Sequence, residues 1–530
     1  MTTDDRLSSS RAVVRSGVFN LAGFVVSAAY MFVLVPVAVR YLGMEQYGLW
    51  TIVMAITGYI GLADLGLSTS FVTYISRFVA VHAYDDAVRV VYLGVVFYIG
   101  VTLLMFGVSL TASSWLFDFL RLAPAQVSAA RTALLLAVAL FGVTSISGVF
   151  GNTLAAIQRM DVVNGIVMLT LAIKLVVIVL VLVNGGGVAG LLVADVVVTA
   201  VGIPVFLLFT RRFLPGIHLG WKGYDHRLMM TLLRFGAQLQ VSRLSELVQN
   251  HFDKLLLTRY VGLQSAAMYD FGSRPAGRAK QLPVTAIASL VAAVSALDAR
   301  EDNARIHAAL VRATRYLAIL AAPLFGIIVA LALPLMQVWL GPGHEQAALT
   351  LQLLSTGFFV SVVVSALSLI SQGRGEPQFQ MRAMLLQVIL NIALSLTLVL
   401  TFGYYGAVAG TTISSIAGGL FFFWLYGRRL MRHPLRFLVS LIWKPVGVAV
   451  LISVVGGVSF GWARIAVPEA GVGILAALIL LWGCLMVLAY ALILRWLKVL
   501  GDDDRGFFRA ALPARLRVFF KENGNISTVA

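Results

Sequence analysis

The 530-residue sequence has few charged residues and a single cysteine. Only 12% of its residues are charged, against about 25% in soluble proteins, whereas 60% are hydrophobic and the mean hydropathy is +0.93. With so little charge, we expect lipid rather than water to be the solvent of most of the chain. Cys484 has no second cysteine with which to form a disulfide, and because it lies in an apolar run we expect it to be a packing residue.

Sequence signals of enzymes are also missing. There is no Walker motif and no Ser/His/Asp or Cys/His grouping, so nothing favours an enzyme or a bound cofactor. Gly185, Gly187 and Gly190 fit the dinucleotide-binding spacing, but the run before them, residues 171–183, is typical of a membrane helix rather than a strand. The acidic run at 502–504 is typical of a solvated segment rather than a metal site.

We also expect no cleavable signal peptide. The first fifteen residues contain Asp4, Asp5 and three arginines, with no short apolar region before a small-residue cleavage site. We therefore expect the first apolar helix to insert uncleaved.

Long hydrophobic runs dominate the rest of the sequence. A helix needs roughly 20 mostly apolar residues to cross about 30 Å of hydrocarbon. Fourteen such windows lie near residues 16–38, 47–71, 88–112, 133–157, 162–183, 187–210, 232–258, 264–297, 312–338, 348–371, 382–402, 405–427, 440–463 and 471–496. The seventh and eighth windows are the most polar. The sequence therefore predicts an all-α polytopic membrane protein with about fourteen transmembrane helices.

The Lys and Arg residues give the orientation. If the N-terminus is cytoplasmic, 29 of the 40 basic residues fall in cytoplasmic segments and 5 fall in outer loops. Positive charge favours the cytoplasmic side of a membrane, so this bias places both termini in the cytoplasm. The net charge of +17 is then explained by topology, and we expect no nucleic-acid partner.

Two short motifs repeat at nearly the same offset. Arg-Tyr-Leu-Gly at 40–43 returns as Arg-Tyr-Val-Gly at 259–262, and Gly-Val-Ala-Gly at 187–190 returns as Ala-Val-Ala-Gly at 407–410. Six spans separate the copies, which predicts two parallel six-helix lobes with a substrate site between them. The predicted parts are a cytoplasmic N-terminus at 1–15, an N-lobe at 16–210, a cytoplasmic linker at 211–231, a C-lobe at 232–427, two further spans at 428–496 and a basic tail at 497–530.

Six basic residues fall inside predicted spans. Each costs roughly 2.5–3.5 kcal/mol at the centre of a bilayer, so we expect each to face a water-filled cavity or an acidic partner. They are Lys174, Arg243, Lys254, Arg274, Arg278 and Lys280. All but Lys174 lie in spans seven and eight.

Helical spacing groups these polar residues into stripes. Arg243, Glu246, Asn250 and Lys254 share one face of span seven, and Arg274 and Arg278 share one face of span eight. Lys280 joins the second stripe only if the helix bends, and the prolines at 275 and 283 allow a bend.

Two interpretations of these cations stay open. One is a cation-lined cavity for an anionic substrate such as a phosphate or an acidic sugar. The other is a set of structural ion pairs, namely Arg243–Glu246, Asp270–Arg274 and Lys174–Asp195.

Acidic residues inside spans bear on ion coupling. They are Asp64, Asp195, Glu246, Asp253 and Asp270. Transporters driven by protons or sodium ions use such groups, but each of these acids can equally serve as the partner of a nearby cation. Coupling to either ion stays open at this point.

The C-terminal tail alternates aromatic and basic residues between Arg505 and Phe520. It fits an interfacial helix on the anionic inner leaflet as well as an ordinary disordered tail.

Several short motifs resemble a known family. Val35-Pro36, then Arg40 to Gly43, Tyr47-Gly48-Leu49-Trp50 and residues 62–67 are similar to the start of the Wzx-type oligosaccharide flippases of polysaccharide biosynthesis. Residues 252–257, with Tyr260-Val261-Gly262 and Tyr269, are similar to the opening of that family's second lobe. The resemblance covers the first twelve spans.

This resemblance implies a function. The family belongs to the multidrug/oligosaccharidyl-lipid/polysaccharide (MOP) exporter superfamily, whose two six-helix bundles form a V around a central cavity. It implies a flippase that moves an undecaprenyl-diphosphate-linked oligosaccharide from the inner to the outer leaflet of the bacterial inner membrane by alternating access. The partners implied are the lipid-linked oligosaccharide, membrane lipids and, more remotely, polysaccharide polymerase or export proteins.

Two relatives and one other class of protein compete with this interpretation. Lipid II flippases place cations in their first two spans, whereas residues 17–39 and 47–76 contain no cation. Multidrug extruders of the MATE type often use an acid in the first span, and this first span has none. A non-transporting membrane scaffold would use its basic tail and would tolerate the loss of Arg274 or Arg278.

Overall fold

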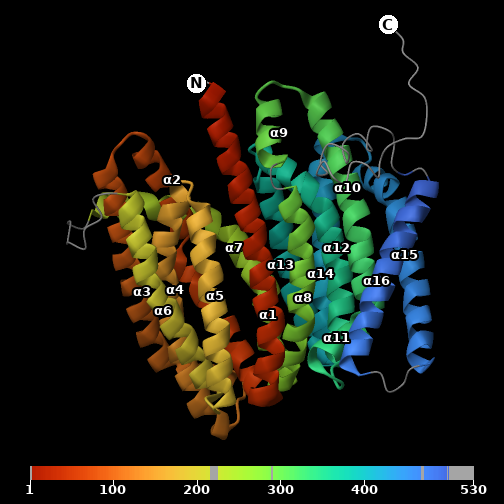
Figure 1. The fold of residues 1–530 in the computed structure, drawn as a ribbon, viewed down its shortest axis with the longest axis horizontal. Coiled ribbons are helices and arrows are strands. Elements are labelled where there is room, and N and C mark those ends of the chain that lie inside the picture. Colours follow the sequence, from red (N-terminus) through yellow and green to blue (C-terminus); the bar gives the residue numbers. More distant parts are fainter. Residues whose placement is uncertain (1–2, 215–224, 288–289, 467–470, 498, 500–530) are drawn as a thin grey trace. The chain divides into compact units, whose positions relative to one another are not determined.

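The computed structural model describes residues 3–214, 225–287, 290–466, 471–497 and 499. This part of the chain folds into helices joined by turns, without a β-strand (Figure 1). The helices are α1 Thr3–Ile60, η1 Gly61–Asp64, α2 Leu67–Ala80, α3 Tyr84–Phe119, α4 Pro124–Ala156, α5 Met160–Val183, α6 Gly187–Phe213, α7 His226–Tyr260, α8 Leu263–Ala286, α9 Leu290–Asp298, α10 Asn303–Ala330, α11 Ala332–Leu340, α12 Glu345–Gly373, α13 Gln378–Phe402, α14 Tyr404–Leu430, α15 Pro434–Ala466 and α16 Val472–Trp496. The prediction of an all-α membrane protein is confirmed.

Eleven helical stretches of the described chain are long and apolar enough to cross a membrane. One of them, Ala22–Asp64, contains two predicted spans, because α1 loses its helical geometry at Gly43. Helices α7 and α8 are too polar to be counted among the eleven, although both are long enough to cross. Separating the two arms of α1 and adding α7 and α8 gives about fourteen crossings, as predicted.

Some predicted spans are interrupted. The second span, predicted as one helix over 47–71, ends at Ile60, passes through the short helix η1 and resumes as α2 at Leu67, because Leu65 and Gly66 are left-handed. The eighth span, predicted over 264–297, is divided into α8 and α9, and the ninth is divided into α10 and α11 at Leu331. These are corrections to helix boundaries that leave the order of the spans unchanged.

The glycine of the first repeated motif has a positive φ and lies at a break between helices in both copies. Gly43 ends the first arm of α1 with φ 74°, and Gly262 separates α7 from α8 with φ 121°. Residues with a Cβ atom rarely adopt a positive φ, so glycine suits both turns. The division into lobes at 16–210 and 232–427 stays a prediction. Residues 215–224 of the predicted linker and nearly all of the predicted tail, with its acidic run at 502–504, lie outside the described residues.

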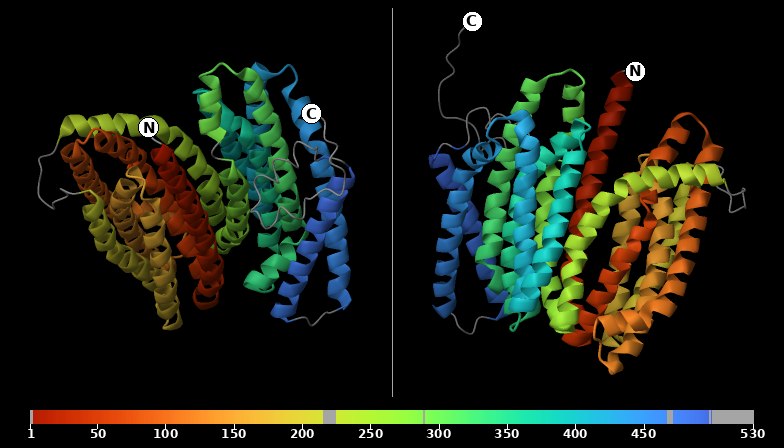
Figure 2. Two further views of the ribbon diagram at one scale, coloured as in Figure 1. Left: turned by 45° about the horizontal axis from the view of Figure 1, so that its top comes forward. Right: turned by 180° about the vertical axis from the view of Figure 1, so that it is seen from behind.

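The described chain divides into two compact units. The first comprises Met1–Arg278, Trp339–Gly357 and Gln378–Gly419. Within it, α4 packs against α3 and α6, and α1 packs against α5. Helix α7 is strongly curved (Figure 2). Its N-terminal half packs on α2, where the Ser70 hydroxyl donates to the carbonyl of Leu232 at 2.9 Å, and α7 also packs against α1 and α13.

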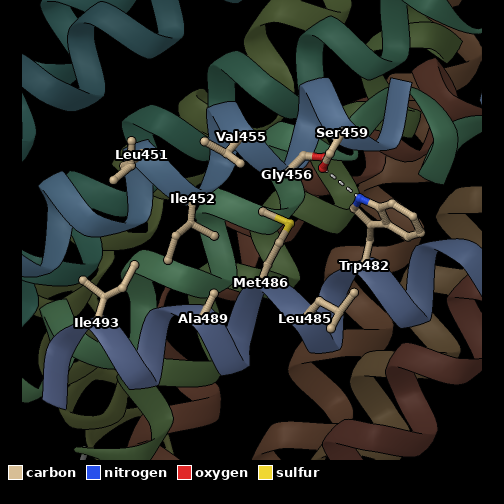
Figure 3. Close-up of a pocket in the computed structure, with 10 residues that line it drawn as sticks. All are labelled: Leu451, Ile452, Val455, Gly456, Ser459, Trp482, Leu485, Met486, Ala489 and Ile493. Carbon is tan, nitrogen blue, oxygen red and sulfur yellow. Dashed lines mark hydrogen bonds between the residues drawn. The ribbon is translucent and has the colours of Figure 1, made fainter. Parts of the chain in front are cut away.

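The second unit comprises Ala279–Val338, Phe358–Pro377 and the chain from Leu420 onward. Its core forms where α10 packs against α15 and α15 packs against α16. An apolar groove of about 390 Å³ runs between α15 and α16, with Met486 over its centre (Figure 3). At one end the Trp482 indole donates to the Ser459 hydroxyl at 3.0 Å. With hardly any polar lining, this groove cannot recognise a sugar or a phosphate.

Candidate substrate-binding site

Three charged residues of the first unit meet at Asp270 of α8. Its carboxylate is completely buried and accepts from Lys254 Nζ at 2.7 Å. Arg274 Nε lies 2.5 Å from the same carboxylate, and the Tyr47 hydroxyl of α1 donates to it at 2.9 Å. We call these four residues the Asp270 cluster. The cluster joins α1, α7 and α8.

The local sequence explains how these groups meet. The turn at Gly262 folds α8 back along α7, which brings Lys254 opposite Asp270. Asp270 and Arg274 are four residues apart, so they lie on the same face of α8. The predicted ion pair between them is therefore observed, but Asp270 is shared with Lys254.

Aromatic rings line the Arg274 side of the cluster. The guanidinium of Arg274 lies 5.2 Å from the centroid of the Trp50 ring, within the range of a cation–π interaction. The Tyr47 ring packs edge-on against Trp50, with ring centroids 5.2 Å apart, and in a tilted arrangement against Phe271 at 4.8 Å. The Arg274 side chain keeps 24% of its surface exposed, whereas that of Asp270 keeps none. Arg274 is thus held by its neighbours and still accessible to an anion.

Arg278 continues the predicted stripe one turn further along α8. Its guanidinium donates to the Ser27 hydroxyl at 3.3 Å and lies 5.9 Å from the Phe24 ring centroid, both on α1. Lys280, which the sequence placed off the stripe, belongs to the second unit and lies 4.9 Å from the Phe358 ring centroid. The structure therefore brings Lys254 and Arg274 together, with Arg278 next along the same face of α8.

Lys174 pairs with Asp195. The lysine of α5 forms a salt bridge with the aspartate of α6, and both side chains are more than four-fifths buried. The pairing suggested by the sequence is observed.

The other predicted residues have different surroundings. Asp64 is buried at the break before α2, where it accepts from the Ser68 hydroxyl at 3.0 Å and from Tyr98. Glu246 is exposed on α7. Arg243 lies within α7, but its side chain is outside the described part of the structure. Asp253 is buried among hydroxyl and amide groups, away from the acceptor shared by Lys254 and Arg274.

Sequence reasoning missed Tyr47 and Trp50 as site residues. The motif that contains them, Tyr47-Gly48-Leu49-Trp50, supports only the family resemblance in the sequence. The signal that identifies them is three-dimensional, because their contact with Asp270 and Arg274 spans more than two hundred residues of sequence. A polar aromatic such as Tyr47 in an otherwise apolar span is a weak signal by itself.

Comparison with known proteins places the chain in a family. The polysaccharide biosynthesis protein family matches residues 13–297, more than half of the chain. A putative O-antigen transporter from Shigella flexneri is 21% identical over 424 residues, covering 79% of this chain and 98% of that protein.

Solved structures share the fold at low sequence identity. An inward-facing MATE family multidrug transporter of the MOP superfamily aligns with a TM-score of 0.64 at 16% identity, covering 76% of this chain and 94% of the transporter. The lipid II flippase MurJ, in an inward closed conformation, aligns with a TM-score of 0.63 at 14% identity, covering 92% of this chain and 99% of MurJ. The chain thus belongs to the polysaccharide biosynthesis protein family and has the fold of the MOP superfamily of membrane transporters.

Proposed function

We propose that this protein is a flippase that moves an undecaprenyl-diphosphate-linked oligosaccharide from the inner to the outer leaflet of the bacterial inner membrane. The family match and the similarity to a putative O-antigen transporter support this substrate class. Both termini are proposed to lie in the cytoplasm, as the distribution of Lys and Arg predicts.

The observation that carries the proposal is the charge of the Asp270 cluster. One buried carboxylate serves two cations, Lys254 and Arg274, so the cluster keeps one formal positive charge. Arg278 adds a second positive charge on the same face of α8. Excess positive charge in a membrane is costly unless an anion completes the site. A diphosphate brings a matching charge and several acceptor oxygens.

Arginine suits this role for a geometric reason. A guanidinium offers several N–H donors in a plane and can bind a phosphate through two parallel hydrogen bonds. Arg274 approaches Asp270 through Nε, and its terminal nitrogens are proposed to bind the phosphate. The ring of Trp50 lies against the Arg274 guanidinium and limits its movement.

The Asp270 cluster also suggests how binding is linked to movement. A bound phosphate can replace Asp270 as the acceptor for Arg274. Asp270 then keeps Lys254 and Tyr47 of α1 as its partners, so the interactions that join α1 to α8 change. A ligand shifts a conformational equilibrium only by its differential affinity for the two states. An exchange of acceptors at Asp270 supplies such a difference during alternating access.

A cationic drug is a poorer fit to this site. It would meet two or three positive side chains and one carboxylate that is already shared. Lipid II carries a diphosphate as well, so the site alone does not separate a lipid II flippase from an oligosaccharide flippase.

Reconstitution tests the proposal and separates these substrates. Purified protein in liposomes is given a lipid-linked oligosaccharide, lipid II or a cationic dye, and exposure of each in the opposite leaflet is followed with time. We expect faster exposure of the lipid-linked oligosaccharide than in protein-free liposomes. Transport of the dye alone, or of no lipid, would refute the proposal.

A further inference from the structure

Pro36 leaves one backbone carbonyl of α1 without its usual helical partner. In an α-helix the carbonyl of Phe32 accepts from the N–H of residue 36, and proline has no N–H. This carbonyl lies inside the first predicted span, where lipid offers no donor. Prolines are tolerated in membrane helices because a neighbouring helix can supply the missing hydrogen bond. The carbonyl of Phe32 is therefore open to a donor from another helix.

Trp339 of α11 supplies that donor. Its indole Nε1 donates to the Phe32 carbonyl at 2.7 Å, although the two residues are 307 positions apart in the sequence. The two rings also pack in a tilted arrangement, with centroids 5.2 Å apart. Helix α1 belongs to the first predicted lobe and α11 to the second, and both residues lie in the first compact unit. A hydrogen bond and a ring contact thus join the two predicted lobes at this point.

The same arm of α1 also contacts Arg278. The Arg278 guanidinium lies 5.9 Å from the Phe24 ring centroid and donates to the Ser27 hydroxyl at 3.3 Å. Phe32 follows Ser27 by five residues, or about 7.5 Å along the helix. A continuous helix between two contacts links their positions. Trp339 therefore helps to fix the arm of α1 that meets Arg278.

Both partners of this bond can be satisfied in two ways. In the structure the carbonyl of Phe32 is bonded to the indole of Trp339. If the two helices separate and water enters between them, carbonyl and indole can each bond to water instead, at little loss of enthalpy. A carbonyl inside a regular helix has no such choice, because it stays bonded to its own N–H partner. The bond is thus suited to a contact that is repeatedly made and broken.

We propose that Trp339 is a releasable clasp between the two predicted lobes, made while α1 and α11 are in contact and broken when the outer side opens. Trp339 lies in the last turn of α11, directly before the predicted outer turn that begins at Gly341. The role of the clasp in transport rests on the proposed function. A phosphate bound by Arg278 competes with Ser27, and the arm of α1 then depends more strongly on Trp339.

Labelling of a buried position tests the clasp. Ala266 of α8 is completely buried, in a cluster with Ile52 of α1 and Leu120 of α3. It lies about one turn from the predicted outer end of α8, so separation of the lobes should expose it. In a Cys484→Ala, Ala266→Cys background, the rate of labelling by a membrane-impermeant maleimide is measured in spheroplasts.

Trp339→Phe keeps an aromatic ring but removes the donor. The state in which α1 and α11 are in contact then leaves the Phe32 carbonyl without its indole partner, so the open state gains population. We expect labelling of the cysteine at 266 to become at least about fivefold faster. Trp462→Phe is the matched control, because the Trp462 side chain is 74% exposed, and it should keep the parental rate.

Pro36 makes the test specific to this bond. In a Pro36→Ala background the carbonyl of Phe32 regains a helical donor, so Trp339→Phe should change the labelling rate less than about twofold. An equal effect of Trp339→Phe in both backgrounds, or no effect in the parental one, would overturn the proposal.

A second replacement does not depend on the folding of the Pro36→Ala protein. Benzothienylalanine in place of Trp339 keeps the shape of the indole but has sulfur instead of the N–H, and it should speed labelling as Trp339→Phe does. Labelling at the parental rate would overturn the clasp. Faster labelling of Trp339→Phe without lipid transport by the parental protein would refute the proposed function only, and lipid transport with unchanged labelling would refute this inference only.

Discussion

Lys254 Nζ donates to the buried carboxylate of Asp270 at 2.7 Å, sixteen residues away on the next helix. This bond crosses the turn at Gly262 and connects the two most polar spans of the chain. The same carboxylate holds Arg274, so one acid organises both cations. Changes at Asp270 should therefore affect folding and substrate binding together.

Replacing Asp270 with asparagine should strongly destabilise the protein. The change removes the buried counter-charge that Lys254 and Arg274 share, and breaking a buried ion pair by removing one partner costs roughly 3–5 kcal/mol. We expect a clear fall in the apparent melting temperature in detergent. Asp86→Asn is the control, because its pair with Arg89 is solvent-exposed and worth about 0–1 kcal/mol. Equal melting temperatures for the two variants would contradict this account of Asp270.

Lys174 and Asp195 should show strong coupling in a double-mutant cycle. Either single change, Lys174→Met or Asp195→Asn, strands a charge in the membrane, whereas the double change strands none. The double variant should therefore be more stable than the sum of the single effects predicts. Additive shifts in melting temperature would show that the ion pair between the two residues does not stabilise the protein.

Gly48 marks a close approach between α1 and the start of α8. A Cβ added to Gly48 would overlap the carbonyl group of Leu263, which is backbone and cannot move aside as a side chain would. Gly48→Ala should lower the melting temperature, since overpacking typically costs about 1–3 kcal/mol. Gly100→Ala is the control, because no atom lies within 4 Å of its added Cβ. A Gly48→Ala variant as stable as the Gly100→Ala variant would argue against this packing.

Much of the fold follows from the sequence, because membrane crossing imposes a length and a polarity on each helix. The windows that correspond to α3 to α6 are mostly apolar, and each predicted span overlaps its helix. The break at Leu65 and Gly66 was missed, because a left-handed pair hardly changes the hydropathy of a window. Asp64 was recognised as a membrane acid, but its bond to Tyr98 depends on how α3 packs.

The candidate site was only partly predictable for a similar reason. Spacing along one helix identified Arg274 and Arg278 and suggested the Asp270–Arg274 pair. It cannot show that Lys254 shares Asp270, since that contact depends on the angle between α7 and α8. It also placed Glu246 with Lys254 on one face, whereas the curved α7 leaves Glu246 exposed and buries Asp253.

Cysteine labelling tests the predicted orientation. In a Cys484→Ala background, single cysteines replace exposed residues at four turns: His82 and Arg300 on the predicted cytoplasmic side, and Arg121 and Asn184 on the outer side. A membrane-impermeant maleimide added to spheroplasts should label the outer pair only. Labelling of the cytoplasmic pair from outside would overturn the assignment made from the 29-to-5 distribution of basic residues.

The most direct test of the account is the rate at which an Arg274→Gln, Arg278→Gln double variant flips a lipid-linked oligosaccharide in liposomes. Hydrogen bonds to charged groups contribute roughly 1.5–3 kcal/mol each, so losing both guanidinium groups should slow flipping at least tenfold. The Arg89→Gln control, which alters an exposed arginine, should keep the parental rate. If the double variant folds normally and flips at the parental rate, the Asp270 cluster and Arg278 do not bind the diphosphate. Normal flipping by the double variant together with loss of function on deletion of the tail would favour a scaffold.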